Sequence, residues 1–131
     1  MQKKNVNPHF DISKLDSLPK IEIVYMYEDA SAIAINAFIN DKTEGLIIAG
    51  VGNGSINKDI LQAVETAVKK GIIVVHASRV ASGRFTQFNQ VFDDKKLGTI
   101  AADSHYPQKA RILLMLALTI TRDQNIIKEC F

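Results

Sequence analysis

LIIAGVGNGSINKDILQAVETAVKKGIIVVH, residues 46–76, decides the fold, because it holds two strand-like runs joined by a turn and a helix. Leu46–Ala49 is a short, continuous apolar run, which is typical of a strand covered on both faces. Gly50–Ser55 (GVGNGS) follows it as a glycine-rich turn. Gly71–His76 (GIIVVH) repeats the buried-strand pattern, so the stretch predicts a strand–helix–strand unit with parallel strands.

The helix between these two strands has the clearest period in the chain. Ile60, Val64 and Val68 recur at i, i+4 and i+8, which places them on one helical face. Gly71 can close the helix in the left-handed conformation. We therefore expect a helix over Asn57–Lys70 with one face against the sheet.

Strands and helices continue to alternate on both sides of this unit. Upstream, Ile21–Tyr27 predicts a strand, and Asp29–Asn40 predicts a helix that is capped by Asp29. The apolar face expected for that helix consists of Ala30, Ala32, Ile33, Ala34, Ala37 and Phe38. Downstream, residues 77–96 form a polar stretch without a period, and a loop of that length is more often functional than idle. The remaining expected elements are a short strand at Gly98–Ala102, a helix at Pro107–Thr119 and a last helix from Thr121 or Asp123.

This order of elements predicts an α/β fold with a small parallel sheet of about four strands, flanked by helices on both faces in a Rossmann-like three-layer arrangement. We assign residues 20–131 to this domain. Residues 1–19 are polar, contain Pro8 and Pro19, and are interpreted as a linker or arm. In such a sheet the strand-to-helix loops gather at the carboxyl edge, which is where these folds bind ligands.

Composition excludes several classes of function. The chain has 131 residues, with 16 Lys+Arg against 14 Asp+Glu, and a net charge of +2 gives no basic surface for nucleic acid. No window reaches the ~18 apolar residues of a membrane span. The single cysteine, Cys130, and three dispersed histidines give no metal site, and Cys130 is expected to be a small apolar filler. We therefore expect no nucleic-acid, membrane or metal partner.

The glycine-rich turn has the context of a phosphate site but not its full sequence. Gly50 and Gly52 match G-x-G-x-x-G, whereas the third glycine position holds Ser55. The next strand ends in His76 instead of the acidic residue that binds a ribose. The turn still presents Asn53 and Ser55 near a helix N-terminus, which favours a carboxylate or an amide oxygen. A stand-alone small-ligand binder and a turn without a ligand both stay open as alternatives.

The chain offers few candidate catalytic groups. Asp103-Ser104-His105 has the residue types of a hydrolytic triad, but adjacent side chains on one loop diverge, and a triad is a spatial arrangement. His76 is expected to be a strand-end histidine bonded to a neighbour. The carboxyl edge is therefore predicted to bind a ligand without a nucleophile and base of its own.

Five ordered segments of the chain resemble one protein family. In order and spacing they are similar to the C-terminal domain of bacterial L-asparaginases of the periplasmic, high-affinity type, a family that also contains glutaminase-asparaginases. The segments are FDISKLDSLPKIEIVY (Phe10–Tyr25), AGVGNGS (Ala49–Ser55), VVHASRVASG (Val74–Gly83), TQ (Thr86–Gln87) and PQKARILLMLALT (Pro107–Thr119).

The resemblance implies a function that needs a second domain. In the family the larger N-terminal domain carries the threonine nucleophile, so we expect no catalytic residue in this chain and no cofactor. The C-terminal domain completes the active site of a neighbouring subunit, for hydrolysis of L-asparagine, or of L-glutamine in some members. A homo-oligomer that includes the missing N-terminal domain is therefore implied, and the chain alone is expected to be inactive.

Four polar residues match or adjoin the family's substrate-binding positions. Ser55 stands where relatives have Asn or Ser to hold the substrate's α-amino end, and Asn53 lies close to it in sequence. Where relatives read T-Q-x-x-E-V, this chain reads TQFNQV, so Gln90 replaces the glutamate and Asn89 is the neighbouring candidate. A glutamine cannot pair ionically with an ammonium group, which should weaken binding by about 1–2 kcal/mol. His76 stands where relatives have an arginine.

By the same resemblance, Met1 lies inside a two-domain protein. We therefore expect the chain to be an excised domain or the product of a split gene, from a parent enzyme that is periplasmic or cytoplasmic. A dimerisation or assembly module, which would use the apolar residues of the arm and of the last helices, is the alternative function from another class.

Overall fold

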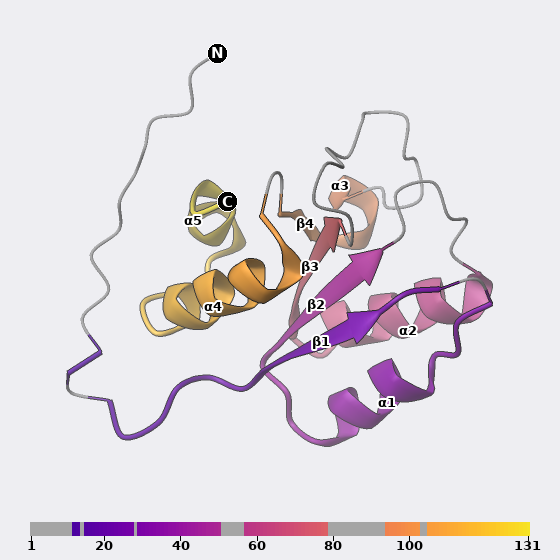
Figure 1. Cartoon of the computed structure of the whole chain (residues 1–131), viewed down its shortest axis with the longest axis horizontal. Coiled ribbons are helices and arrows are strands. Elements are labelled where there is room, and N and C mark those ends of the chain that lie inside the picture. Colours follow the sequence, from indigo (N-terminus) through magenta and orange to yellow (C-terminus); the bar gives the residue numbers. More distant parts are fainter. Residues whose placement is uncertain (1–11, 14, 28, 51–56, 79–93, 103–104) are drawn as a thin grey trace, which may run out of the picture.

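The computed structural model describes residues 12–13, 15–27, 29–50, 57–78, 94–102 and 105–131. Four strands form one sheet in which all neighbours are parallel (Figure 1). Their order across the sheet is also their order in the sequence: β1 (Ile21–Tyr25), β2 (Gly45–Gly50), β3 (Ile73–Ser78) and β4 (Ile100–Ala101).

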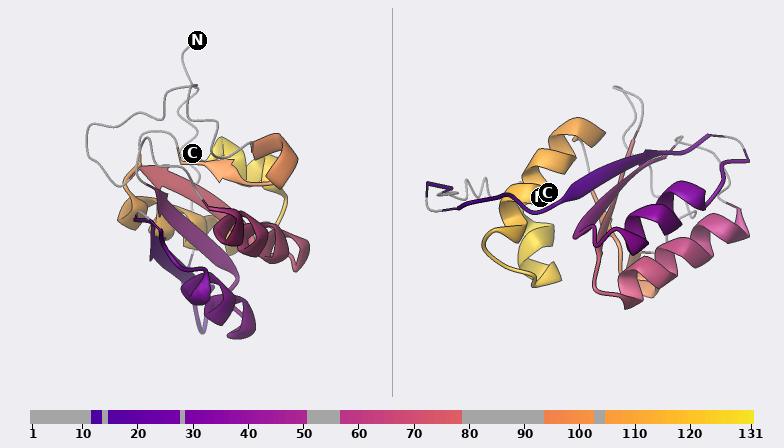
Figure 2. Two further views of the ribbon diagram at one scale, coloured as in Figure 1. Left: turned by 90° about the vertical axis from the view of Figure 1, so that its right-hand side faces the viewer. Right: turned by 90° about the horizontal axis from the view of Figure 1, so that it is seen from below.

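Helices cover both faces of the sheet, which confirms the predicted three-layer α/β fold (Figure 2). One face carries α1 (Ile33–Asn40) and α2 (Lys58–Lys69), and the other carries α4 (Pro107–Leu118) and α5 (Gln124–Glu129). The short α3 (Asp94–Leu97) precedes β4. The helices α1 and α2 share a face because both connect adjacent parallel strands in the same direction, and such crossovers are right-handed.

The α2 helix has the signals that the sequence predicted. The Asn57 side chain accepts a hydrogen bond from the Ile60 backbone N–H and so caps the helix at its start. Ile60 and Val64 are buried against the sheet. Gly71 has φ 85° and ends the helix in the left-handed conformation.

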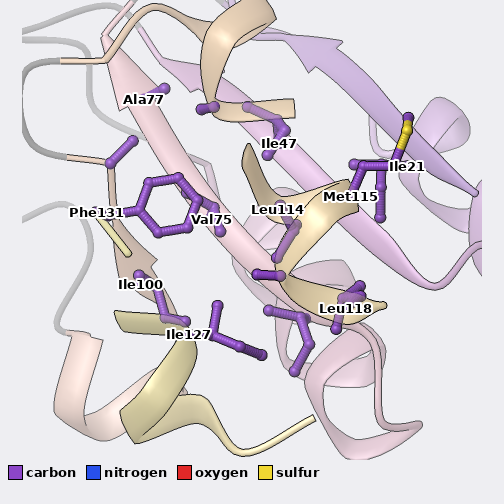
Figure 3. Packing of buried hydrophobic residues seen from close by; sticks show 14 residues of the cluster. Ile21, Ile47, Val75, Ala77, Ile100, Leu114, Met115, Leu118, Ile127 and Phe131 are labelled. Atoms are coloured by element: carbon purple, nitrogen blue, oxygen red, sulfur yellow. The ribbon is translucent and has the colours of Figure 1, made fainter. Parts of the chain in front are cut away.

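Two apolar cores lie on opposite faces of the sheet, because successive side chains of a strand point to opposite sides. In β2, Ile47 belongs to the core under α4 and α5, whereas Leu46 and Ile48 belong to the core under α1 and α2. Figure 3 shows the first core, where Leu114 of α4 and Ile127 of α5 lie close to the strand residues. All six residues of β2 are buried, and each fully buried large side chain contributes about 1.5–3 kcal/mol.

The first helix is shorter than predicted, and its apolar face differs. Helix α1 begins at Ile33, and Asp29, the predicted cap, has φ 58° and lies outside the helix. The Ser31 hydroxyl accepts a hydrogen bond from the Ile33 N–H instead. Ile35 is fully buried, whereas Ile33 is 76% exposed. The prediction was wrong because it placed six apolar residues on one face. Asn36 and Asn40, four positions apart and both exposed, mark the outer side of the helix, and Ile33 lies beside them.

Several other boundaries also differ from the predictions. The β3 strand starts at Ile73 instead of Gly71, because Gly71 still belongs to the turn that closes α2 and Ile73 is the first residue paired with β2. The predicted loop over residues 77–96 is wrong at both ends. Ala77 and Ser78 belong to β3, and the four residues of α3 are too few to show a period. The last helix was predicted to start at Thr121 or Asp123, and Asp123 is the residue that caps α5. Cys130 is half-buried against the core, which confirms its role as a filler.

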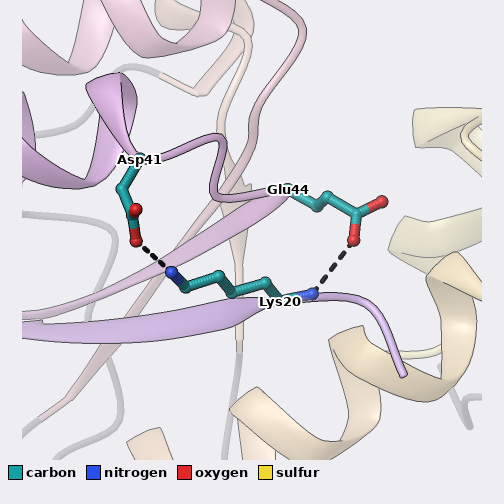
Figure 4. A network of polar contacts seen from close by, with 3 residues as sticks. All are labelled: Lys20, Asp41 and Glu44. Carbon is teal, nitrogen blue, oxygen red and sulfur yellow. Dashed lines mark hydrogen bonds and ion pairs between the residues drawn. The ribbon is translucent and has the colours of Figure 1, made fainter. Parts of the chain in front are cut away.

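A polar network holds the start of β1 at the amino edge of the sheet. The Glu44 carboxylate accepts hydrogen bonds from the Lys20 backbone N–H at 3.0 Å and from the Arg122 guanidinium at 2.6 Å. The Lys20 ammonium pairs with Asp41, and the hydrogen bond to that carboxylate raises the pKa of Lys20 (Figure 4). Exposed ion pairs of this kind contribute little stability singly. Together they connect the first strand to two turns that are distant in the sequence.

We predict that Gly45→Ala destabilises the fold. A Cβ at Gly45 would lie 2.8 Å from Ile21 Cδ1 and 2.8 Å from Leu114 Cδ2, so the buried side chains around it would have to move. The free energy of unfolding should fall by about 1–3 kcal/mol, as overpacked cores do. Urea denaturation followed by circular dichroism measures the change.

Gly50→Ala, at the other end of the same strand, is the matched control. A Cβ there meets nothing within 4 Å among the described residues, so its effect on unfolding should be clearly smaller. Equal losses for the two variants would contradict this account of packing.

Candidate functional site

The two predicted ligand loops start next to each other at the carboxyl edge of the sheet. Gly50, the last residue of β2, is the register partner of Ser78, the last residue of β3. Residues 51–56 follow Gly50 directly, and residues 79–93 follow Ser78. The two segments therefore leave the sheet from paired positions on adjacent strands.

Asn57 fixes the point where the first of these segments rejoins the fold. Its side-chain amide donates a hydrogen bond to the Ala30 carbonyl at 2.9 Å, and its side-chain oxygen accepts from Ile60 N–H at 2.9 Å. One side chain thus connects α2 to the turn before α1. The helix predicted over Asn57–Lys70 includes Asn57, but its contact with the Ala30 carbonyl was not predicted.

A compact polar cluster lies where the second segment rejoins the fold. His76 Nε2 lies 2.6 Å from Asp94 Oδ1, and the Thr99 hydroxyl donates to the same oxygen at 2.6 Å. His76 is 6% exposed and Thr99 is also buried. This contact confirms the prediction that His76 is a strand-end histidine bonded to a neighbour.

The cluster has the residue types of a catalytic triad but not the order of one. In a triad the imidazole lies between the hydroxyl and the carboxylate, so that it can take the hydroxyl proton. Here the Asp94 carboxylate lies between His76 and Thr99 and accepts from the threonine hydroxyl. This arrangement orients chain segments and does not activate the threonine.

Asp94 stays ionised because its partners outweigh its burial. Burial of the carboxyl group is the largest single effect and favours the neutral form, but the hydrogen bonds from His76 and Thr99, together with the nearby charges of His76 and Lys128, outweigh it. The net result lowers the pKa of Asp94 below its ordinary value of 3.8. An ionised carboxylate has no proton to donate, so His76 Nε2 is the donor in this pair.

The predicted substrate-binding residues lie outside the described part of the chain. These are Ser55, Asn53, Gln90 and Asn89, and their contacts stay predictions. Asp103 and Ser104 also lie outside it, whereas the ring of His105 packs edge-on against Phe131 with centroids 6.0 Å apart. The structure describes the strand ends from which the predicted loops start and the residues that hold those ends.

A separate groove of about 450 Å³ lies between α1 and α2. Its polar lining comes from Ser31, Asn36, Asp59, Gln62 and Thr66, none of which was predicted as a site residue. The groove is open to solvent and contains a single acidic group, so it lacks the convergent titratable side chains expected of an active site. We therefore keep the carboxyl edge as the candidate site.

Two kinds of site are absent from the described part of the chain. Among the described residues, no three His, Cys, Asp or Glu side chains are grouped so that they could hold a metal ion. None of the described helices is long and apolar enough to cross a membrane. The four described strands also run in sequence order across the sheet, so no reversal of strand order among them provides the crevice where doubly wound folds bind dinucleotides.

Sequence comparison identifies the class of protein to which this fold and this edge belong. The sequence model of the Glutaminase/Asparaginase C-terminal domain matches residues 20–131, so the chain belongs to that family. This result confirms the resemblance on which the assignment of the site residues depends.

Individual relatives are similar over almost the whole chain. The chain is 44% identical over 129 residues to the probable periplasmic L-asparaginase of Haemophilus influenzae, covering 98% of the chain and 37% of that relative. It is 44% identical over 130 residues to L-asparaginase 2 of Escherichia coli, covering 99% and 37%. It is 35% identical over 130 residues to the glutaminase-asparaginase of Pseudomonas fluorescens, covering 99% and 36%. The chain thus spans little more than a third of the length of these relatives.

We predict that Asp94 makes the stability of the fold depend on acidity. Because the pKa of Asp94 is lower in the folded chain than in the unfolded chain, its contribution is fully present above pH 3.8. The contribution is lost as the pH falls below that value and the folded carboxyl takes up its proton. Asp94→Asn should therefore cost about 1.5–3 kcal/mol near neutral pH, the usual value for a charged hydrogen bond, and much less in acid.

Urea denaturation of the chain and of Asp94→Asn across this pH range measures the difference. Asp16→Asn, which removes an exposed carboxylate of the arm, should change stability little at any pH. A cost for Asp94→Asn that is the same at neutral and acid pH would contradict the prediction.

Proposed function

We propose that this chain is the C-terminal domain of an L-asparaginase and completes the active site of a neighbouring subunit. The reaction is hydrolysis of the side-chain amide of L-asparagine to L-aspartate and ammonia. One observation carries the proposal: the chain is 44% identical to two L-asparaginases over nearly its whole length. Residues 1–19 then serve as the linker from the upstream domain.

The chemistry is divided between the two domains. A threonine hydroxyl of the upstream domain attacks the amide carbonyl, ammonia leaves, and water releases aspartate from the acyl-enzyme. The present chain contributes binding groups, with Ser55 and Gln90, and their neighbours Asn53 and Asn89, holding the α-amino end of the substrate. The reaction uses no cofactor. The paired origins of the two loops, at Gly50 and Ser78, support this role.

The substrate includes L-glutamine in the broader form of the proposal, because one of the relatives is a glutaminase-asparaginase. The two substrates differ by one methylene group and share the α-amino and α-carboxylate ends. The role proposed for Ser55 and Gln90 is to bind this shared α-amino end, so it is the same for both substrates.

A hybrid enzyme tests the proposal. The upstream part of the Haemophilus influenzae relative, joined through residues 1–19 to this chain, should release ammonia from L-asparagine. The 131-residue chain alone should release none above background, because the nucleophile is supplied by the other domain. A folded hybrid without activity, or activity of the pure chain alone, would refute the proposal.

Gln90→Glu in the same hybrid tests the position of the substrate's ammonium group. A glutamate there restores a charge-assisted hydrogen bond, so KM for L-asparagine should fall by about tenfold, the equivalent of about 1.4 kcal/mol. Asn89→Asp adds the same charge at the neighbouring position and serves as the control. If KM is lowered by Asn89→Asp and not by Gln90→Glu, the match of the loop to the family is shifted by one residue.

A second role, as an assembly module, is favoured by the outer face of α4. Ile112 of α4 is 48% exposed, and Leu116, one turn further along the same face, is only partly buried. Ile120, two residues past the end of the helix, is 59% exposed. A helix with apolar residues on its inner and outer faces is usually covered on both. Sedimentation of the chain at high concentration separates the roles, since a strict monomer would remove self-association as a function of the chain alone.

A further inference from the structure

Helices α1 and α2 form the two walls of a groove, called here the α1–α2 groove, on a face of the domain that the candidate site does not use. The helices lie side by side against the sheet (Figure 1). The groove has a volume of about 450 Å³, which is within the range of about 300–1,000 Å³ typical of small-molecule sites. Its α2 wall consists of Asp59, Gln62, Ala63 and Thr66. These positions recur at intervals of three and four residues and so form one stripe along the helix.

Small side chains leave the space that the groove occupies. Ala63, the most buried residue of the lining, belongs to the core under α1 and α2, and Ala32 packs partly against the same core. The side chains of Gln62 and Ile33 beside them are longer and exposed. The groove therefore has an apolar floor and a rim of longer side chains, so a ligand can contact apolar and polar groups together.

Two polar groups of the α2 wall can only accept hydrogen bonds. The Thr66 hydroxyl donates to the Gln62 backbone carbonyl at 2.9 Å, so its proton is used within α2 and its oxygen is left to accept. Asp59 is the single charged residue among the described residues of the lining, and an ionised carboxylate is an acceptor only. None of the ion pairs between described residues involves Asp59. The groove therefore favours a ligand group that donates hydrogen bonds and carries positive charge.

An exposed apolar side chain lies on the other wall of the groove. Ile33 of α1 is 76% exposed, the largest exposed fraction among the large apolar side chains of the described residues. An alkyl chain that covers Ile33 removes apolar surface from water, which is favourable. Because Ile33 and Asp59 line the same groove from different helices, one ligand can contact both when its alkyl chain carries a positive charge at one end.

We propose that the α1–α2 groove binds a primary alkylammonium group, with Asp59 as its ion partner, Thr66 as a hydrogen-bond acceptor and Ile33 as the contact for the alkyl chain. An ammonium group has three donors and no acceptor, which matches the two acceptor groups of α2. A free alkylamine and the side chain of a lysine in another protein share this chemistry. The inference does not depend on the proposed function, because none of the residues assigned to asparagine binding lines the groove.

A titration of the 131-residue chain with matched ligands tests the site. Pentylamine is protonated near neutral pH, as a lysine side chain is. It should shift the amide NMR signals of residues 31–36 and 59–66 with a Kd of about 1 mM, the affinity expected of a small ligand in an open groove. 1-Pentanol has the same chain without the charge and should bind at least about tenfold more weakly. Pentanoate carries the opposite charge and should cause no saturable shift.

Variants at exposed positions assign the two contacts. Asp59→Asn should weaken the binding of pentylamine about tenfold, whereas Glu65→Gln removes a carboxylate of α2 outside the groove and should leave binding unchanged. Ile33→Ser should weaken the binding of pentylamine about fivefold and that of ethylamine less, because the shorter chain covers less of Ile33. Ala34→Ser, at an exposed position of α1 outside the groove, is its control. Circular dichroism should show the same fold for all four variants, since each replaced side chain is exposed.

The outcomes decide both the site and its ligand. The absence of a saturable shift with pentylamine, equal binding of pentylamine and pentanoate, or unchanged binding of pentylamine by Asp59→Asn would each overturn the proposal. Where the site holds, Nα-acetyl-lysine methylamide identifies the source of the group: binding at least about tenfold tighter than that of pentylamine assigns the groove to a lysine of a partner protein. Equal or weaker binding assigns it to a free alkylamine. Failure of the groove leaves the proposed function intact, because the hybrid enzyme tests that function separately.

Discussion

The complete burial of β2 is the constraint on which the rest of the structure depends. A strand that contacts water on neither face must satisfy its backbone N–H and C=O groups through its two neighbours. β1 and β3 provide these partners in parallel register along the length of the strand. Its alternating side chains must fill two cores at once, which places helices on both faces. The same register sets Gly50 opposite Ser78, so the packing of the core determines where the candidate loops begin.

The accuracy of sequence-based prediction followed the strength of the local signal. Helix α2 was predicted almost residue by residue, because a cap, an apolar period and a terminal glycine agree with one another. In helix α1 the outer side is marked only by Asn36 and Asn40, and the predicted apolar face did not use them, so Ile33 was placed inside although it is exposed and Ile35 is the buried residue. The ends of β3 and β4 depend on which residues find a partner strand, and that is a tertiary property.

For the candidate site, too, some features could be predicted from the sequence and others could not. Parallel strands and right-handed crossovers are enough to predict that the loops share one edge, and the structure confirms this for their origins at Gly50 and Ser78. Composition and period say nothing about the role of Ser55 or Gln90, which rests on the family resemblance. The contact between His76 and Asp94 joins residues that are 18 positions apart across a stretch without a period, so no sequence pattern could have shown it. The sequence predicted that His76 bonds to a neighbour, but it did not predict which residue that neighbour is.

The polar network around Glu44 has a mechanical consequence for any protein chain that continues upstream of Lys20. It holds Lys20 at the amino edge of the sheet, whereas the candidate loops start from Gly50 and Ser78 at the carboxyl edge. A strand of five or six residues spans about 17–20 Å, so Lys20 lies about that far from the strand ends where the loops start. An extended chain covers about 3.3–3.6 Å per residue, and residues 1–19 are therefore long enough to pass the whole sheet or to reach across to a neighbouring molecule. A force transmitted through such an upstream chain would first load the contacts of Lys20 with Glu44, at the edge of the sheet opposite the starts of the candidate loops.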